Sequence, residues 1–452
     1  MGAYWCELAV VGEPSHGTVA HGVLVETRGG AVSAVRAGTE PPPGATRLAG
    51  LVLPGLANAH CHAFHRALRG RTQAGVGDFW AWREAMYQVA GGLDPDSYKR
   101  LARATYAEMT LAGITTVGEF HYLHHGPGGV PYADPNAMGE ALVVAAAEAG
   151  IRLTLLDTCY LQGNVDGAPL GEVQQRFGDR DAEAWAARTA TWPGELAATG
   201  RWRPGAAIHS VRAVPPQAMA TVAGAASGRD QPLHAHLSEQ RAENEACRAV
   251  LGATPAQVLA DAGALSVAAT MVHATHLDPA DVAALGRAGA TACLCPTTER
   301  DLADGVGPAR ALAGAGSPLC LGTDSQAVVD LFEEARAVEL DERLATERRG
   351  HHRPADLLAA ATSGGAASLG WGGGGRIAPG APADLVAVSL ATPRLAGTTD
   401  RTAVAAAVFA ATAADVTDVV VGGRQVVAEG RHLVVEDVAG ELAGAIGALV
   451  DA

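Results

Sequence analysis

The middle of the chain alternates short apolar segments, rich in β-branched residues, with longer Ala-rich segments, and this alternation constrains the fold most. It is typical of βα units that build a parallel sheet. Eight candidate strands are present, and the segments between them are long enough for the helices of a closed barrel. The predicted strands end near Asn58, Phe120, Thr158, His209, His236, Ala274, Pro296 and Asp324. An α/β fold is therefore expected, either a TIM-like (β/α)8 barrel or an open doubly wound sheet.

Polar side chains capable of chemistry stand at these predicted strand ends. They come from distant parts of the chain: His60, His62, Glu119, His121, His209, His236, His273 and Asp324. Barrel enzymes build their active sites from the loops at the C-terminal ends of the strands. Because an open sheet would gather fewer of these residues, their positions favour the barrel.

The two ends of the chain have a different character. Residues 4–38, 383–390 and 416–435 read as short strands, and the Gly29-Gly30 pair suits a hairpin turn. A chain of 452 residues can form one large domain and one smaller one. We therefore expect a barrel over residues 51–376, and a small β-sandwich domain built from residues 1–50 and 377–452.

The composition indicates the cellular compartment and excludes some classes of binding partner. The seven cysteines are scattered and never spaced as C-x-x-C, which argues against disulfides and indicates a reducing, cytoplasmic setting. The N-terminal residues lack the pattern of an export signal, and charged residues interrupt every long apolar segment, so no membrane partner is expected. A formal charge of -15 would repel nucleic acid, although a local positive pocket could bind a small anion.

The histidines after the first predicted strand suggest a metal site. His60 and His62 are two residues apart, so on an extended strand their imidazoles point to the same side. His236 and Asp324, each at another strand end, can complete the ligand set. Imidazole and carboxylate ligands suit one divalent ion, with Zn²⁺ preferred and Fe²⁺ possible.

Two further residues have the chemistry that hydrolysis at such a site requires. Zinc lowers the pKa of a water to roughly 7, which makes water a nucleophile at neutral pH. Glu239, three residues after His236, is the expected general base and acid, and Asp324 is expected to assist. His273 is expected to orient the water or stabilise developing charge.

These residues resemble the amidohydrolase superfamily over about residues 50–390. The shared pattern is L-P-G-x-x-x-x-H-x-H after the first strand, H-x-x-E after the fifth, His after the sixth and Asp after the eighth. Binuclear members use a carbamylated lysine at the fourth strand, but the only lysine here, Lys99, lies on a predicted helix. The resemblance therefore implies a mononuclear, deaminase-like site.

Other segments are similar to the formimidoylglutamate deiminases within that superfamily. They are F-W-x-W-R-E-x-M-Y, E-F-H-Y-L-H-H, L-L-D-T-C-Y, Q-Q-R-F and I-H-S-V-R-A-V. The resemblance implies a homodimeric hydrolase of histidine degradation that deiminates N-formimidoyl-L-glutamate to N-formyl-L-glutamate and ammonia. It also implies substrate binding by His65, Arg83, Tyr122, His209 and Arg212, although His65 replaces the glutamine of the family pattern.

The substrate can also be argued from the two arginines. Guanidinium groups recognise carboxylates through paired hydrogen bonds, so Arg83 and Arg212 suit a small dicarboxylate, although surface ion pairs are an alternative for both. Two other functions remain open: an aminohydrolase of a purine, pyrimidine or triazine ring, and a catalytically silent binding protein.

Several nearby residues are expected to have no direct role. His121, His124 and His125 are interpreted as solvated loop residues or as hydrogen-bonding neighbours of the site, and not as a second metal site. Trp80, Trp82 and Tyr87 are interpreted as packing residues.

Overall fold

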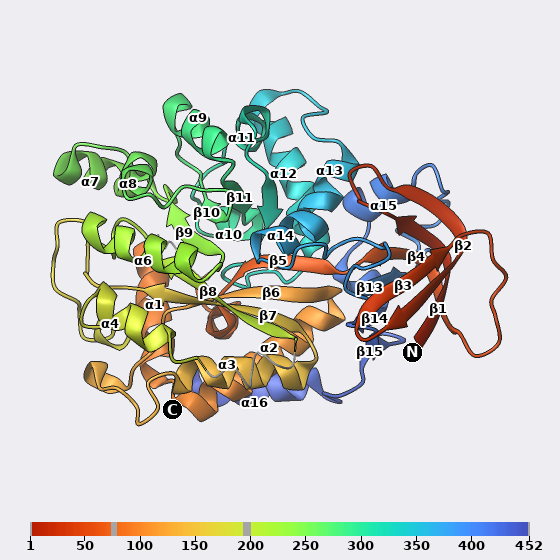
Figure 1. Cartoon of the computed structure of the whole chain (residues 1–452), viewed down its shortest axis with the longest axis horizontal. Helices are drawn as coiled ribbons and strands as arrows, with labels where there is room; N and C mark the ends of the chain where they lie inside the picture. The colour runs from red at the N-terminus through yellow and green to blue at the C-terminus, as the bar shows by residue number, and fades with distance from the viewer. Residues whose placement is uncertain (1, 74–78, 193–199, 451–452) are drawn as a thin grey trace.

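The eight central strands form a closed parallel barrel in the computed structural model, which describes residues 2–73, 79–192 and 200–450 (Figure 1). The strands are β5 (Leu56–Cys61), β6 (Ile114–His121), β7 (Arg152–Cys159), β8 (Trp202–Ile208), β9 (Leu233–Leu237), β10 (Ala269–His273), β11 (Thr291–Leu294) and β12 (Leu319–Leu321). Each pairs in parallel with the next, as the sequence pattern predicts. Every predicted strand end lies within three residues of the observed one. The barrel is confirmed, and the open sheet is excluded.

Closure occurs between the first and last barrel strands. Cys61 and Asp324 form a parallel bridge, and the His60 carbonyl accepts hydrogen bonds from the backbone N–H groups of Thr323 and Asp324 at 3.1 and 3.0 Å. A side chain at Gly322 would clash here, because an added Cβ would lie 2.7 Å from His60 Cβ and 2.8 Å from its carbonyl oxygen. Glycine thus permits β12 to approach β5.

Helices cover the outside of the barrel. The helices between the barrel strands and after the last one are α1 (Phe79–Gly92), α2 (Pro95–Leu111), α3 (Ala137–Ala149), α4 (Ala182–Thr189), α6 (Pro216–Gly228), α7 (Arg241–Leu251), α8 (Pro255–Asp261), α9 (Pro279–Ala288), α10 (Pro296–Asp301), α11 (Ala309–Ala315), α12 (Leu331–Thr346), α13 (Pro354–Ala359) and α14 (Gly365–Ser368). Local signals define their starts: α2 begins with a capping box between Asp94 and Ser97 and has Pro95 in its first turn. Lys99 lies on this helix, as predicted, and its Nζ pairs with Glu148 Oε1 at 2.8 Å.

A second sheet joins both ends of the chain. Its strands are β1 (Gly2–Val11), β2 (Thr18–Arg28), β3 (Ala31–Arg36), β4 (Thr46–Pro54), β13 (Leu385–Val388), β14 (Val416–Val421), β15 (Arg424–Ala428) and β16 (Arg431–His432), shown in red and blue at one side of Figure 1. They form one continuous sheet, in which β4 pairs with β13. Gly29 and Gly30 have φ angles of 60° and 82°, the left-handed conformation that a tight hairpin requires, so the predicted turn is confirmed.

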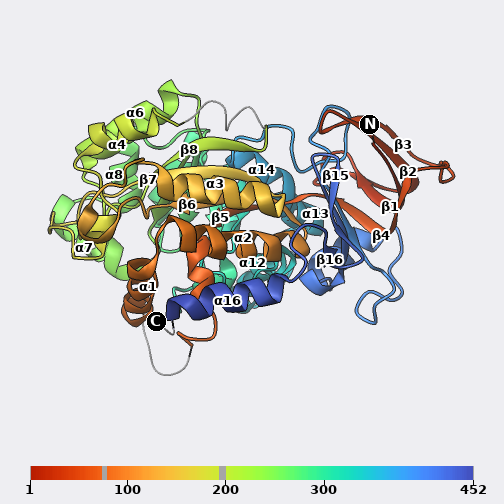
Figure 2. The ribbon, with the colours of Figure 1, turned by 90° about the horizontal axis from the view of Figure 1, so that it is seen from below.

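The chain returns to the barrel after this sheet. Helix α16 (Val438–Val450) lies along α2, as Figure 2 shows, and Glu441 of α16 pairs with Arg103 of α2. At the other junction, Gly55 alone separates β4 from β5. The division into residues 1–50 with 377–452 and residues 51–376 stays a prediction.

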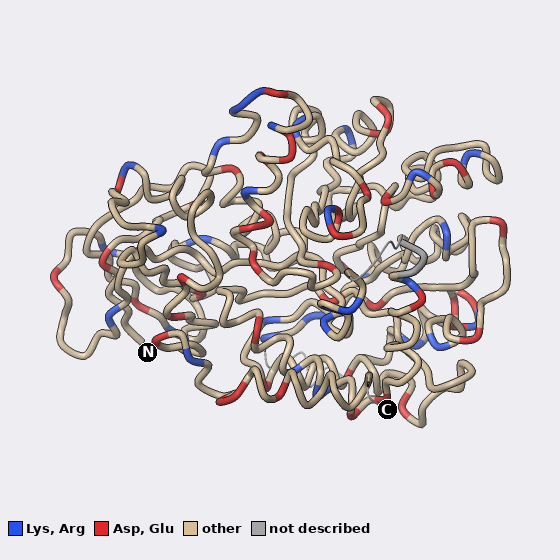
Figure 3. Tube along the Cα trace, turned by 180° about the vertical axis from the view of Figure 1, so that it is seen from behind, with Lys and Arg blue, Asp and Glu red and all other residues tan. Residues whose placement is uncertain are grey.

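Two surface properties bear on possible partners. Among the described residues, no helix combines the length and the apolar character needed to cross a membrane. Figure 3 shows Lys and Arg positions interspersed with Asp and Glu positions along the backbone.

A buried ion pair joins the barrel to the second sheet, and it provides a test of the packing between them. Arg152 of β7 pairs with Asp384, and each residue is 5% exposed. Asp384→Ala would leave the Arg152 charge buried without its partner, so we expect a loss of about 3–5 kcal/mol in unfolding free energy. Chemical denaturation followed by circular dichroism measures this loss.

The matched control is Glu26→Ala, because the Glu26–Arg36 pair lies at the surface with side chains 40% and 53% exposed. This change should cost less than about 1 kcal/mol. Equal losses in the two variants would contradict the structural role of the Arg152–Asp384 pair.

Candidate active site

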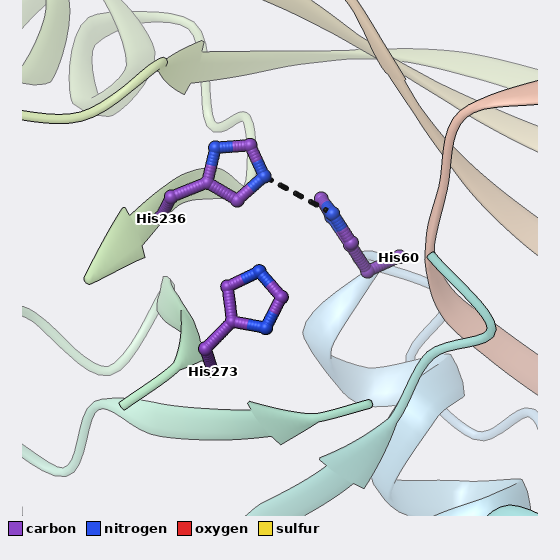
Figure 4. A group of neighbouring side chains, drawn as sticks. All are labelled: His60, His236 and His273. Atoms are coloured by element: carbon purple, nitrogen blue, oxygen red, sulfur yellow. Dashed lines mark hydrogen bonds between the residues drawn. The ribbon is translucent and has the colours of Figure 1, made fainter. Parts of the chain in front are cut away.

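Side chains from four separate barrel segments converge at the C-terminal mouth. His60 lies on β5 and His62 directly follows it, His236 lies on β9, and Asp324 follows β12. Figure 4 shows His60 and His236 turned toward each other, with His273 of β10 beside them. All of these side chains are buried. The structure therefore brings together the residues that the sequence nominated as metal ligands.

The distances between neighbouring polar atoms match those expected between ligand atoms of one shared ion. Asp324 Oδ1 lies 3.3 Å from His60 Nε2 and 3.4 Å from His62 Nε2, and His236 Nε2 lies 3.2 Å from His60 Nε2. Tetrahedral ligands about 2.0–2.1 Å from zinc would lie about 3.3 Å from one another. His60, His62 and Asp324 form one group with metal-binding geometry, and His60, His236 and His273 form another that shares His60. Imidazole and carboxylate donors of this kind suit Zn²⁺ and Fe²⁺.

Backbone carbonyls orient two of the imidazoles. His62 Nδ1 donates to the Phe120 carbonyl and His236 Nδ1 donates to the His209 carbonyl, each at 2.9 Å. These bonds place the Nε2 lone pairs toward the shared position. Burial also lowers the pKa of His62 to about 3 and the pKa of His60 well below its ordinary value. The imidazoles are therefore neutral, the form that binds metal.

Glu239 and His273 lie beside the proposed ligands. His273 Nε2 is 3.7 Å from Glu239 Oε1 and 3.8 Å from Asp324 Oδ2, and His273 Nδ1 is 3.5 Å from Glu299 Oε1. Burial lowers the pKa of His273, but the surrounding carboxylates outweigh it and raise the pKa to about 10. An imidazole enclosed by carboxylates in this way is suited to donate hydrogen bonds.

The backbone is strained at the same place. His273, Ala274 and Asp324 adopt left-handed φ angles of 68°, 52° and 41°, and Ser238, next to Glu239, has 51°. Such conformations are costly for residues other than glycine and gather at functional sites. They direct the side chains of His273 and Asp324 into the mouth of the barrel.

Arg212 forms ion pairs with two glutamates of the site, and the sequence did not indicate these contacts. Its Nη2 lies 3.0 Å from Glu239 Oε2 and its Nε lies 3.2 Å from Glu243 Oε2. Glu243, on α7, also accepts a hydrogen bond from the backbone N–H of Ser238 at 3.0 Å. The expected carboxylate-binding arginine thus contacts the expected general base directly, and the surface ion pair considered for Arg212 is wrong.

A cavity of about 290 Å³ lies over these residues. It is lined by His62, His65, Trp82, Arg83, Met86, Tyr87, Tyr122, Tyr160, Gly163, Asn164, Phe177, His209, Arg212, His236, Glu239, His273, Leu302 and Asp324. All five side chains nominated for substrate binding are in this set. Its size lies just below the usual range of roughly 300–1,000 Å³, which suits a small metabolite.

The unusual histidine, His65, has a defined environment. Its Nε2 lies 3.0 Å from Tyr122 Oη, and its ring packs 4.4 Å from that of His62 and 5.0 Å from that of Trp82. His65 therefore shares a hydrogen bond with another cavity residue and contacts a proposed metal ligand.

Two tyrosines of the cavity were missed as functional candidates. Tyr87, interpreted as packing, lines the cavity, and the Arg83 guanidinium carbon lies 5.5 Å from the centre of its ring. Tyr160 follows β7 directly and packs its ring 4.5 Å from that of His209. Its position after a predicted strand end was a signal that could have identified it.

The three histidines around and after β6 are buried instead of solvated. His124 Nε2 donates to the Thr158 carbonyl at 2.9 Å, and His125 Nε2 lies 3.5 Å from Asp179 Oδ1. Within the described part of the chain, none of the three belongs to a group with metal-binding geometry. His124 therefore bonds to the backbone of β7, and its interpretation as a hydrogen-bonding neighbour of the site stays a prediction. The Trp80 side chain lies outside the described residues.

Comparisons with known proteins agree with this geometry. A model of the amidohydrolase family matches residues 51–426. The chain is 40% identical over 418 residues to the formimidoylglutamate deiminase of Pseudomonas aeruginosa, covering 90% of this chain and 91% of that protein. It is 31% identical over 398 residues to an 8-oxoguanine deaminase of the same species, covering 85% and 86%. An amidohydrolase structure from Brucella melitensis matches with a TM-score of 0.91 at 31% identity, covering 100% of both chains.

Metal retention can be tested with two neighbouring substitutions. His236→Asn removes a nitrogen from the convergent group, so we expect affinity for Zn²⁺ to fall by more than about tenfold, since loss even of a residue that only orients a ligand costs 10–100-fold. Glu239→Gln is the control and should bind Zn²⁺ as the wild type does, because no group with metal-binding geometry among the described residues includes Glu239. Competition against a chromogenic chelator measures both, and equal affinities in the two variants would contradict the ligand assignment.

Proposed function

The chain belongs to the amidohydrolase family, and from this we propose that it hydrolyses N-formimidoyl-L-glutamate to N-formyl-L-glutamate and ammonia. It is a hydrolase that acts on C–N bonds, in a family that depends on metal. The observation that carries the choice of substrate is the pair Arg83 and Arg212 in the wall of one small cavity, together with the similarity to a formimidoylglutamate deiminase. This substrate has two carboxylates and one amidine-like carbon.

The proposed site holds one ion per chain, with His60, His62, His236 and Asp324 as ligands and Zn²⁺ preferred over Fe²⁺. When bound, the ion would act as a Lewis acid that activates water for attack on the formimidoyl carbon. Neutral imidazoles and ligand atoms 3.2–3.4 Å apart support this assignment.

Glu239 moves the protons in the proposed reaction. It accepts a proton from the attacking water and delivers it to the nitrogen that leaves as ammonia, so one carboxylate acts as base and then as acid. His273, 3.7 Å from Glu239 and 3.8 Å from Asp324, donates hydrogen bonds that orient the water and stabilise charge on the reacting centre. Hydrogen bonds from His273 to the reacting centre are stronger in this buried site, because the lower dielectric screens them less.

Arg83 and Arg212 bind the two carboxylates of the substrate, and His65, Tyr122 and His209 complete its contacts. Arg212 has a second effect in this arrangement. Because its guanidinium touches Glu239 at 3.0 Å, a carboxylate bound to Arg212 lies next to the proton-transfer residue. Substrate recognition and proton transfer are thereby coupled through one side chain.

We place this enzyme in histidine degradation in the cytoplasm, as a homodimer without nucleic acid or membrane partners. All seven cysteines are free and buried, which agrees with a reducing compartment. A ring aminohydrolase is the alternative, supported by similarity to the 8-oxoguanine deaminase, but a neutral ring would not use two arginines. A silent binding protein is disfavoured, because the residues expected for catalysis converge in one cavity.

The proposed reaction is tested with purified, metal-quantified enzyme and N-formimidoyl-L-glutamate. Ammonia and N-formylglutamate should form in equal amounts, and Glu239→Gln should lower kcat by at least about 10²-fold, the low end for removal of a general acid–base residue. Release of glutamate and formamide would show that the neighbouring C–N bond is cleaved and would refute the deiminase assignment. Preferred turnover of a purine or triazine would favour the alternative.

The two arginines should give different kinetic phenotypes. Arg83→Ala should mainly raise KM, by roughly 10- to 100-fold for a charge-assisted hydrogen bond of about 1.5–3 kcal/mol. Arg212→Ala should raise KM and also lower kcat, because it removes the contact with Glu239. Arg180→Ala is the control, since that side chain is 82% exposed. Unchanged turnover in both cavity variants would rule out dicarboxylate recognition.

A further inference from the structure

We propose that Glu119, a buried carboxylate on β6, is a positioning residue that holds the metal ligands His62 and Asp324 in place. The proposal rests on the metal site proposed above. Glu119 is 0% exposed and does not line the cavity. Across residues 2–73, 79–192 and 200–450, no group with metal-binding geometry includes it. Any effect it has on the ion must therefore pass through other residues.

Glu119 holds both neighbours of His62. Its Oε1 accepts a hydrogen bond from the backbone N–H of Ala63 at 2.9 Å, and its Oε2 accepts one from the Cys61 thiol at 3.2 Å. Residues on either side of the ligand are thus attached to one rigid strand. The next residue of that strand, Phe120, accepts the hydrogen bond from His62 Nδ1. Three attachments to β6 therefore determine where the His62 ring lies.

The same network reaches Asp324 across the closure of the barrel. Gln326 Nε2 donates to Cys61 Sγ at 3.1 Å and to the Asp324 carbonyl at 2.9 Å. Asp324 and Gln326 both have left-handed φ angles, 41° and 59°, so this turn needs tertiary contacts to persist. Cys61 stands between the two ligand segments, accepting from Gln326 and donating to Glu119.

A carboxylate at position 119 needs an explanation, because a buried carboxylate is costly unless hydrogen-bond donors surround it. Tyr106 Oη donates to Glu119 Oε2 at 3.0 Å, and Tyr98 Oη lies 3.5 Å from Oε1. In the described part of the chain, no Lys, Arg or His lies within ion-pair distance of it. An apolar side chain would fill this space at lower cost, whereas an acceptor can hold the ligand segments and favour a nearby cation.

The experiment measures how fast zinc-loaded protein loses Zn²⁺ to excess chelator. Glu119→Gln should release zinc about 10–100-fold faster than the wild type, the range for residues that orient metal ligands. The KM of the metal-loaded fraction should stay unchanged, because Glu119 lies outside the cavity. Cys61→Ala should also release zinc faster, while Cys61→Ser keeps a donor and should restore slow release.

Each outcome decides the proposal. If Glu119→Gln and Cys61→Ala both release zinc at the wild-type rate, the positioning role is wrong, even if their melting temperatures fall. If Glu119→Gln does not fold, the Cys61→Ala and Cys61→Ser pair decides, and equal release rates in that pair overturn the proposal. A wild-type protein that retains no zinc would refute the proposed metal site itself, and this failure is distinct because it appears without any substitution.

Discussion

The closure of the barrel between β5 and β12 is the constraint on which the rest of the structure depends. The His60 carbonyl accepts hydrogen bonds from Thr323 and Asp324, and the backbone N–H of His62 donates to the Asp324 carbonyl at 3.2 Å. The residues that close the sheet are therefore the proposed metal ligands or their neighbours. The contact that closes the sheet therefore also brings His60 and His62 beside Asp324, and Gly322 makes this close approach possible.

The local charge of the site differs from that of the whole protein. The chain carries a formal charge of -15, yet Arg83 and Arg212 face one cavity. Glu239 and Glu243 flank Arg212 and offset the cost of burying its charge. The cavity wall thus carries positive side chains in a protein whose net charge is negative. Global charge therefore says little about the ligand of a buried pocket.

The sequence predicted the barrel, and it named residues that the structure brings together at the mouth of the barrel, because each stands at a strand end or in a recognisable segment. It missed Tyr87, Tyr160 and the Arg212–Glu239 contact. Apolar periodicity reports which elements form, but not which loop side chains turn inward. The Glu119 network was equally out of reach, since its partners come from β5, α2 and the turn after β12.

The sequence by itself determined the order of the elements and the chemistry at their ends, because strand and helix periodicity and the types of polar residue are local properties. The spacing of His60 and His62, and the presence of a single lysine, belong to that level. Only the tertiary structure decided the distances: which imidazole nitrogens face one another, which carboxylates enclose His273, and that Arg212 touches Glu239. These depend on the stagger of eight strands and on backbone angles such as that of His273, which are determined by closure and packing.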